Sequence, residues 1–175
     1  LLTTDFPRNR QRQICELDIG KSAHLWTIYL RREVKEEFFE DKLKNHTKYQ
    51  IRLTTQQKLT SELHLNFRSE WMQRRFPQKN GHGLLLWQQL VWKLPQSQRQ
   101  LRLKFVEVYI HDGGEIYAGT YQMPGLFVNE RFTSSGRAFY LTLQQKWRRF
   151  LFSLFFEQKY LQDSTYSIVK MQMQW

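Results

Sequence analysis

The sequence contains very little cysteine, proline and glycine. Among its 175 residues there are one cysteine, four prolines and eight glycines. A single cysteine, Cys15, excludes an intrachain disulfide and a multi-cysteine zinc site, and it favours a reducing compartment. The scarcity of proline and glycine indicates short loops. We therefore expect an intracellular protein, located in the cytoplasm or in the nucleoid or nucleus.

Long apolar runs are also missing. The most apolar stretches, Leu84–Trp87 and Phe150–Phe156, are far shorter than the roughly 18 to 20 residues of an apolar membrane-spanning helix. The first residues lack the apolar core and cleavage site of a secretory signal. We expect neither feature, and no membrane partner. The chain starts Leu-Leu-Thr-Thr without Met, which leaves open that it is a domain cut from a longer protein.

Positive charge and aromatic side chains are abundant. Lysine and arginine number 27 against 16 acidic residues, a net charge of +11, and aromatic residues make up 15% of the chain. A hydrophobic content of 41% is typical of a packed domain rather than a disordered chain. No repeat or long linker divides the sequence. We predict one domain over residues 13–175, preceded by a flexible basic arm over residues 1–12.

Alternating apolar and polar residues predict several strands and hairpins. The predicted strands are Ile14–Ile19, His24–Leu30, Tyr49–Leu53, Leu63–Phe67, Leu101–His111, Glu115–Tyr121, Leu126–Phe132 and Val169–Trp175. Tyr49–Leu53 and Leu63–Phe67 are expected to form one hairpin. The turn Asp112-Gly113-Gly114 marks a second hairpin, between Leu101–His111 and Glu115–Tyr121, which is the clearest in the sequence.

Other segments have the spacing of helices. The predicted helices are Arg32–Asn45 with its acidic stretch Glu33–Asp41, Glu70–Phe76 after the N-cap Ser69, Leu84–Leu94, and Arg137–Leu161. A strand is the alternative for Leu84–Leu94, because its apolar run is short. The resulting fold class is α+β, with a mainly antiparallel sheet built from hairpins and covered by the long aromatic-rich helix Arg137–Leu161.

Basic clusters beside aromatic residues predict a nucleic-acid interface. Guanidinium groups pair with phosphates, and aromatic rings stack on exposed bases. The candidate binding residues are Arg8, Arg10, Arg12, Arg68, Trp71, Arg74, Arg75, Phe76, Lys79, Lys146, Arg148 and Arg149. The alternative for each cluster is an ordinary solvated helix face. Lys146, Arg148 and Arg149 flank an apolar stripe and suit that alternative as well.

The sequence gives weaker evidence for catalysis than for nucleic-acid binding. Glu107 and Asp112 are acids near one strand that would suit a metal-dependent nuclease, although the acid and lysine arrangement expected on one strand is absent. His82 and His111 would form a general acid–base pair only if the fold brought them together. A phosphate-binding loop and a Gly-x-Ser-x-Gly motif are both missing. We therefore expect no catalytic residue, no metal site and no cofactor.

These observations predict a non-catalytic domain that binds DNA or RNA mainly through phosphate contacts. Such a domain would suit a module of a larger nucleoprotein assembly with other protein subunits. The alternative is a protein-interaction subunit whose positive charge meets an acidic partner. The surplus of phenylalanine in Phe150–Phe156 favours a protein partner too. A metal-dependent nuclease is the third candidate.

Overall fold

The computed structural model is built almost entirely of strands. It describes residues 10–21, 23–39, 42–75, 80–123, 126–162 and 164–174. The strands are β1 (Arg10–Lys21), β2 (His24–Phe39), β3 (Lys42–Lys58), β4 (Leu63–Arg75), β5 (Asn80–Leu94), β6 (Arg99–His111), β7 (Ile116–Met123), β8 (Leu126–Phe132), β9 (Gly136–Trp147), β10 (Phe150–Leu161) and β11 (Ser164–Gln174). Within these ranges the only helical segment is one 3₁₀ turn, η1 (Pro95–Ser97).

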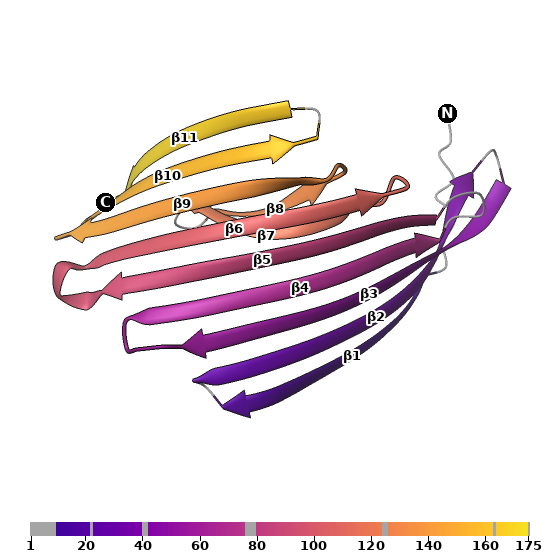
Figure 1. Ribbon diagram of the computed structural model, residues 1–175, viewed down its shortest axis with the longest axis horizontal. Helices are drawn as coiled ribbons and strands as arrows, with labels where there is room; N and C mark the ends of the chain where they lie inside the picture. The colour runs from indigo at the N-terminus through magenta and orange to yellow at the C-terminus, as the bar shows by residue number, and fades with distance from the viewer. Residues whose placement is uncertain are drawn as a thin grey trace, which may run out of the picture.

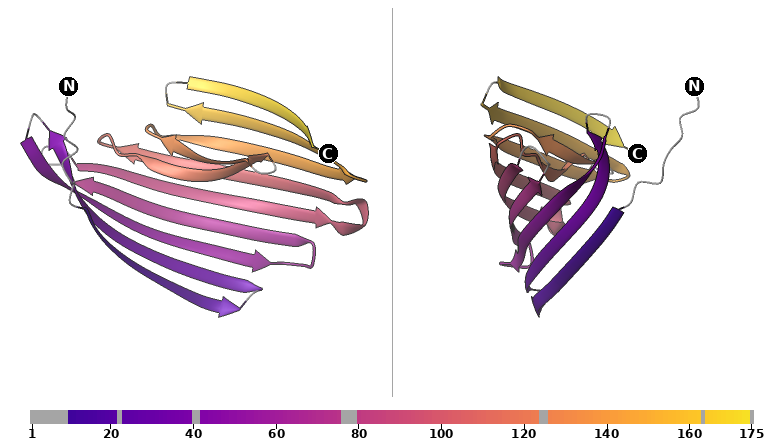
Figure 2. Two further views of the ribbon diagram at one scale, coloured as in Figure 1. Left: turned by 180° about the vertical axis from the view of Figure 1, so that it is seen from behind. Right: turned by 90° about the vertical axis from the view of Figure 1, so that its right-hand side faces the viewer.

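Nine strands form a single antiparallel sheet. Their order is β1-β2-β3-β4-β5-β6-β9-β10-β11, so the chain adds each strand beside the previous one except between β6 and β9 (Figure 1). The sheet is twisted and curved, with β1 and β11 at its two edges (Figure 2). β7 and β8 leave it and pair with each other as a separate antiparallel hairpin. β7 contacts β5 and β10, so this hairpin lies across the sheet.

Tight turns at one end of the sheet reverse the chain between long strands. In the β3–β4 turn the Thr60 hydroxyl accepts hydrogen bonds from the backbone nitrogens of Glu62 and Leu63, at 3.2 and 3.0 Å. The β9–β10 turn is closed by Arg148, whose φ of 53° lies in the left-handed region. Gln98 takes the same conformation, with φ 52°, between η1 and β6. The expectation of short connections is met at these turns.

The hydrophobic core lies between the sheet and the β7–β8 hairpin. We name this side of the nine-stranded sheet the hairpin face; Leu85, Val106 and Phe155 belong to it and are fully buried. The hairpin contributes Ile116, Ala118 and Phe132 to the same cluster. The opposite side of the sheet, named the open face, carries residues such as Leu30, Phe105 and Leu143. The core therefore requires the hairpin, because the sheet alone leaves both faces uncovered.

The turn after β6 packs directly on β5, and Gly114 makes that approach feasible. A Cβ atom at Gly114 would lie 2.2 Å from the backbone oxygen of His82. We expect Gly114→Ala to destabilise the fold by about 1–3 kcal/mol, because backbone must shift to relieve the overlap. Gly83→Ala is the matched control, since its nearest neighbour is a side-chain methyl of Ile110 at 3.3 Å. Urea unfolding midpoints compare them, and equal midpoints would contradict the expectation.

The α+β class is wrong, because the long helix Arg137–Leu161 does not exist. This segment forms β9 and β10, which pair with each other through the turn at Arg148 and Arg149. Its apolar spacing misled the prediction because residues i and i+4 share a face in a strand as well as in a helix. Phe139 and Leu143 are such a pair. The predicted antiparallel sheet built from hairpins is confirmed.

The three other predicted helices are also strands. Arg32–Asn45 is divided between β2 and β3, which pair antiparallel. Glu70–Phe76 falls in β4 up to Arg75, and Leu84–Leu94 lies within β5, as its alternative stated. Helix propensity is a weak local preference that strand pairing overrides. The acidic stretch therefore does not form a solvated helix face: Glu33 lies on the hairpin face of the sheet.

The predicted strands agree with the structure better than the predicted strand pairings do. β1, β6, β8 and β11 overlap the predicted strands, and the hairpin between Tyr49–Leu53 and Leu63–Phe67 is confirmed as β3 and β4. The hairpin expected around Asp112-Gly113-Gly114 is wrong. The chain does turn there, with Asp112 and Gly113 at positive φ. However, β7 pairs with β8, and β9 takes its place beside β6.

Candidate functional site

The open face is strongly apolar. The described part of the chain has 19 exposed large hydrophobic side chains, and all but Ile14, Leu59 and Tyr166 lie on this face. Met171 is 80% exposed and Val169 is 59% exposed. Monomeric soluble proteins rarely expose a contiguous apolar patch larger than a few hundred Å². The open face thus has the composition of an interface.

Cross-strand neighbours on the open face, most of them half-buried, form a band of apolar side chains. One row of neighbours consists of Leu65, Leu90, Leu103, Leu141, Phe156 and Val169 on β4, β5, β6, β9, β10 and β11. Towards β1 the same row continues with the polar residues Gln57, His24 and Lys21. There the apolar side chains lie further along the strands, at Ile28 and Leu53. The band, named the apolar band, therefore runs obliquely across the sheet.

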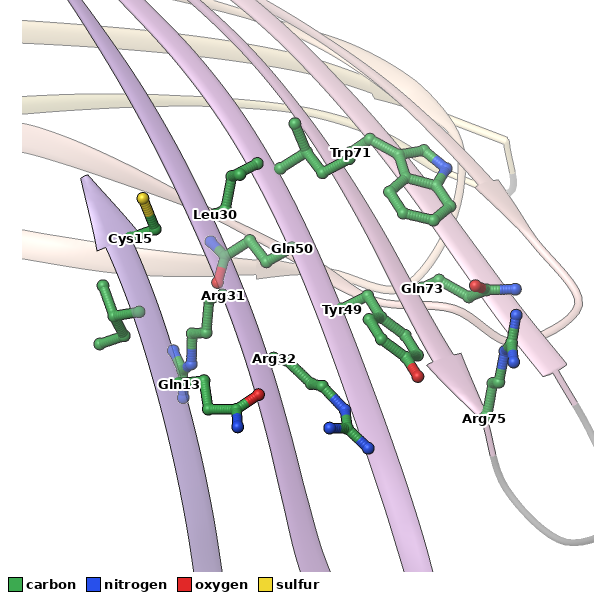
Figure 3. Close-up of a pocket in the computed structure, with 12 residues that line it drawn as sticks. Gln13, Cys15, Leu30, Arg31, Arg32, Tyr49, Gln50, Trp71, Gln73 and Arg75 are labelled. Carbon is green, nitrogen blue, oxygen red and sulfur yellow. The ribbon is translucent and has the colours of Figure 1, made fainter. Parts of the chain in front are cut away.

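One border of the apolar band is a groove on β1 to β4. It has a volume of about 450 Å³, and its lining changes along the strands (Figure 3). Leu30, Ile51 and Trp71 lie at its apolar end. One row further on, Tyr49 and Gln73 are cross-strand neighbours beside charged groups. The border is thus aromatic and polar, a composition typical of a surface between an apolar and an aqueous phase.

Charged groups from that border contact its aromatic ring. The Arg75 guanidinium lies over the Tyr49 ring, 5.3 Å from its centroid. Arg32 lines the same groove (Figure 3). Arginine stacked on an aromatic ring keeps its charged end available to water or to an anionic group.

Tryptophan and basic residues also mark the opposite border. Trp92 is 43% exposed and Trp147 is 63% exposed. The β5–β6 and β9–β10 turns lie beside each other there, because the Lys146 backbone nitrogen donates to the Gln98 oxygen at 3.0 Å. The exposed cations at this end form the basic turn cluster: Lys93, Arg99, Lys146, Arg148 and Arg149. Both borders of the apolar band thus combine aromatic and cationic side chains.

The hairpin face, in contrast, carries paired charges. Glu70 is 3% exposed and is the centre of one cluster. Its carboxylate accepts hydrogen bonds from Gln50 Nε2 at 2.6 Å, Arg52 Nε at 2.9 Å and Arg68 Nε at 2.9 Å. Glu33 likewise pairs with Arg31 and, at 2.6 Å, with Arg10 Nε. Buried carboxylates need such partners, because an unpaired buried charge is costly.

Ion pairs also fasten the β7–β8 hairpin to the sheet. Glu115, just before β7, pairs with Arg74 of β4 and Arg131 of β8. Lys159 of β10 pairs with Glu130 of β8 and with its own neighbour Glu157. Both these ion pairs and the hydrophobic core therefore hold the β7–β8 hairpin against the sheet.

Two adjoining cavities separate the hairpin from strands β1 to β4. Their volumes are about 260 and 320 Å³, and Arg31, Lys48 and Tyr117 line both. Among the described residues, seven lysines and arginines line them together with two carboxylates, Glu33 and Glu70. We name this space the basic cavity. Its lining has a formal charge of +7 − 2 = +5 with histidine neutral, so it favours an anion.

The structure distributes the predicted nucleic-acid residues over several places. Arg68 and Arg74 line the basic cavity on the hairpin face, and each pairs with a glutamate. Trp71 and Arg75 are on the open face, in the groove of Figure 3. Arg8, Phe76 and Lys79 lie outside the described residues.

The other predicted nucleic-acid residues form two groups elsewhere in the structure. Arg10 and Arg12, from the predicted arm, lie in β1 within 4 Å of Glu33. Lys146, Arg148 and Arg149 belong to the basic turn cluster at the end of the sheet. The described members of the predicted interface therefore form no single stripe.

The two acidic candidates for catalysis have different partners. Glu107 on the open face accepts a hydrogen bond from Arg137 Nε at 2.8 Å, whereas Asp112 lies 3.1 Å from His111 Nε2. The register does place His82 opposite His111, a juxtaposition that the sequence left open. Among the described residues no three histidine, cysteine or acidic side chains are close enough to hold a metal ion.

Comparisons with known proteins identify no relative. No family model, no curated protein and no solved structure matches the chain. Within the described ranges, no helix of sufficient length and apolarity to cross a membrane is present.

Neither the open face nor the basic cavity was predicted from the sequence as one surface. The signal for the open face is alternation in β2, where Trp26, Ile28 and Leu30 are separated by polar residues. The basic cavity has no local signal, because Arg31, Lys48 and Arg68 come from three strands and meet only through their register. Knowledge of the pairing order is needed to find it.

Proposed function

We propose that this chain forms a membrane-embedded sheet, with its open face against the hydrocarbon of a lipid bilayer and its hairpin face towards water. The observation that supports this most directly is the apolar band, together with the exposed hydrophobic side chains of the open face. A lipid interior also explains why ion pairs are concentrated on the hairpin face, since unshielded charge is expensive in hydrocarbon. Aromatic residues at both borders suit the lipid–water interface, where tryptophan and tyrosine are enriched.

Strand length and tilt are consistent with this proposal. The nine strands of the sheet contain 11 to 17 residues, which span roughly 36 to 56 Å at about 3.3 Å per residue. Strands that cross a hydrocarbon layer of about 30 Å are tilted by roughly 45°. The oblique course of the apolar band is what such a tilt produces. The proposal also requires partners for the outer edges of β1 and β11, because unpaired backbone groups are costly in lipid.

Nucleic-acid binding is the second candidate, and the basic turn cluster favours it. Its five cations are exposed and gather at one end of the sheet, where phosphates would be accessible. The same cluster would lie at lipid headgroups in a membrane. The predicted intracellular location without a membrane partner belongs with this second candidate. Binding to an acidic protein would use the same cations.

Flotation with vesicles tests the membrane proposal. The full chain is folded in the presence of neutral phosphatidylcholine vesicles, and the vesicles are floated through a density gradient. We expect the chain to float with them and to stay bound after washes with about 1 M salt, where the Debye length is about 3 Å, and with alkaline carbonate. Hydrophobic insertion resists both washes, whereas phosphate contacts do not.

Two results would contradict the proposal. One is a folded chain that remains in the aqueous fraction. The other is a chain that binds only vesicles with anionic lipid and is released by salt alone, which would indicate surface attraction through the basic turn cluster. Binding to random-sequence DNA or RNA with a steep salt dependence, without flotation, would favour the second candidate instead.

A further inference from the structure

The basic cavity has more positive charge than its carboxylates neutralise. Glu33 and Glu70 are engaged by Arg10, Arg31, Arg52 and Arg68. Lys48 lines both parts of the cavity in addition to these pairs. Each carboxylate is thus shared by at least two guanidinium groups, and the cavity keeps a net positive charge.

Buried donors around the cavity point to the same conclusion. The Nε atoms of Arg31 and Arg74 are buried, and neither has a hydrogen-bond acceptor among the described residues. Buried polar groups are normally satisfied, so each exception requires an explanation. Arginine and lysine side chains that converge on one space are the usual partners of phosphate oxygens. An oxyanion in the cavity would offer acceptors to these two Nε atoms.

We propose that the basic cavity binds a small phosphate-bearing anion of about the size of a diphosphate. The two parts, of about 260 and 320 Å³, allow two adjacent phosphate groups to be held between β7 and strands β2 to β4. Lys48 supplies positive charge beyond the ion pairs, and Arg31 and Arg74 supply donors at their buried Nε atoms. The backbone of Gly119 and the Tyr117 side chain of the hairpin close the other side. This site lies on the hairpin face, so it does not depend on what covers the open face.

Calorimetric titration with inorganic pyrophosphate tests this inference. The full chain, folded in mild detergent micelles, is titrated at about 50 mM salt, beside the variants Lys48→Met and Lys93→Met. Lys48 lines the cavity, whereas Lys93 is exposed at the end of β5, so the two variants lose the same charge at different places. We expect saturable binding that Lys48→Met weakens about tenfold and Lys93→Met leaves within twofold, because only Lys48 is placed to form a charge-assisted hydrogen bond with an anion in the cavity.

Parallel titrations with other phosphate compounds identify the class of ligand that the site binds. Binding of a nucleoside triphosphate with the same dependence on Lys48 also supports the site and identifies nucleotides as ligands. Absence of pyrophosphate binding overturns the inference, and so does an equal loss of affinity in both variants. An oligonucleotide that binds while pyrophosphate does not would assign the phosphate contacts to the basic turn cluster instead. Circular dichroism of each variant confirms that its strands are intact.

Discussion

Replacing Leu143 by arginine is expected to reduce folding into neutral vesicles by roughly 30-fold to 1,000-fold. Leu143 is 41% exposed on the open face and has Leu101 and Leu154 as cross-strand neighbours. A cationic side chain at the centre of a lipid-facing sheet costs about 2–4 kcal/mol, and about 1.4 kcal/mol is a factor of ten. In water the same substitution at a half-exposed site would change stability by only about 0.5 kcal/mol.

Gln144→Arg is the matched control. Gln144 is the next residue of β9, and its side chain belongs to the hairpin face, where Gln100 and Ser153 are its cross-strand neighbours. The two variants gain the same charge, one residue apart, on opposite faces of one strand. The folded fraction in vesicles, measured by protease protection, distinguishes them. Equal yields for both variants would remove the evidence for a lipid-facing open face.

Much of the strand content could be predicted from the sequence, but its arrangement could not. Alternation identified β6 because Leu101, Leu103 and Phe105 are separated by Arg102 and Lys104 at the start of the strand. It failed for β9 and β10, where both faces are largely apolar near Phe150–Phe156 and the period is therefore ambiguous. Such a strand has apolar side chains on the open face and buried apolar side chains under the β7–β8 hairpin. Its sequence therefore resembles that of a buried helix. Phe155 is buried and Phe152 is exposed, a difference that only the structure shows.

The functional site was predicted least well, for a related reason. Net charge indicated an anionic partner, and Arg68 and Arg74 do line the basic cavity. Charge density along the sequence does not show that Arg75, the residue after Arg74, points to the opposite face of the sheet. In a strand, adjacent basic residues are separated by the sheet itself. A basic run on a strand is therefore divided between two surfaces, and only cross-strand neighbours can rebuild a cluster.

The charge network of the hairpin face leads to the second large effect, at Glu70. We expect Glu70→Gln to lower the free energy of unfolding by about 3–5 kcal/mol. Glutamine keeps the size of the side chain but removes the negative charge between Arg52 and Arg68. Both guanidinium groups are then left in a cavity that is already positive, and removing one member of a buried ion pair has a cost of this size. Urea unfolding in micelles, followed by tryptophan fluorescence, measures the change.

Two further variants separate lost charge from lost packing at this site. Glu16→Gln, on the exposed strand β1, removes the same charge and is expected to change stability by about 0.5 kcal/mol at most. Adding Arg68→Met to Glu70→Gln removes one of the stranded cations, so the double variant should recover part of the stability lost in the single one. Coupling between residues in contact is usually about 0.5–3 kcal/mol. Strictly additive losses would show that Glu70 and Arg68 are not coupled and that the basic cavity tolerates its own positive charge.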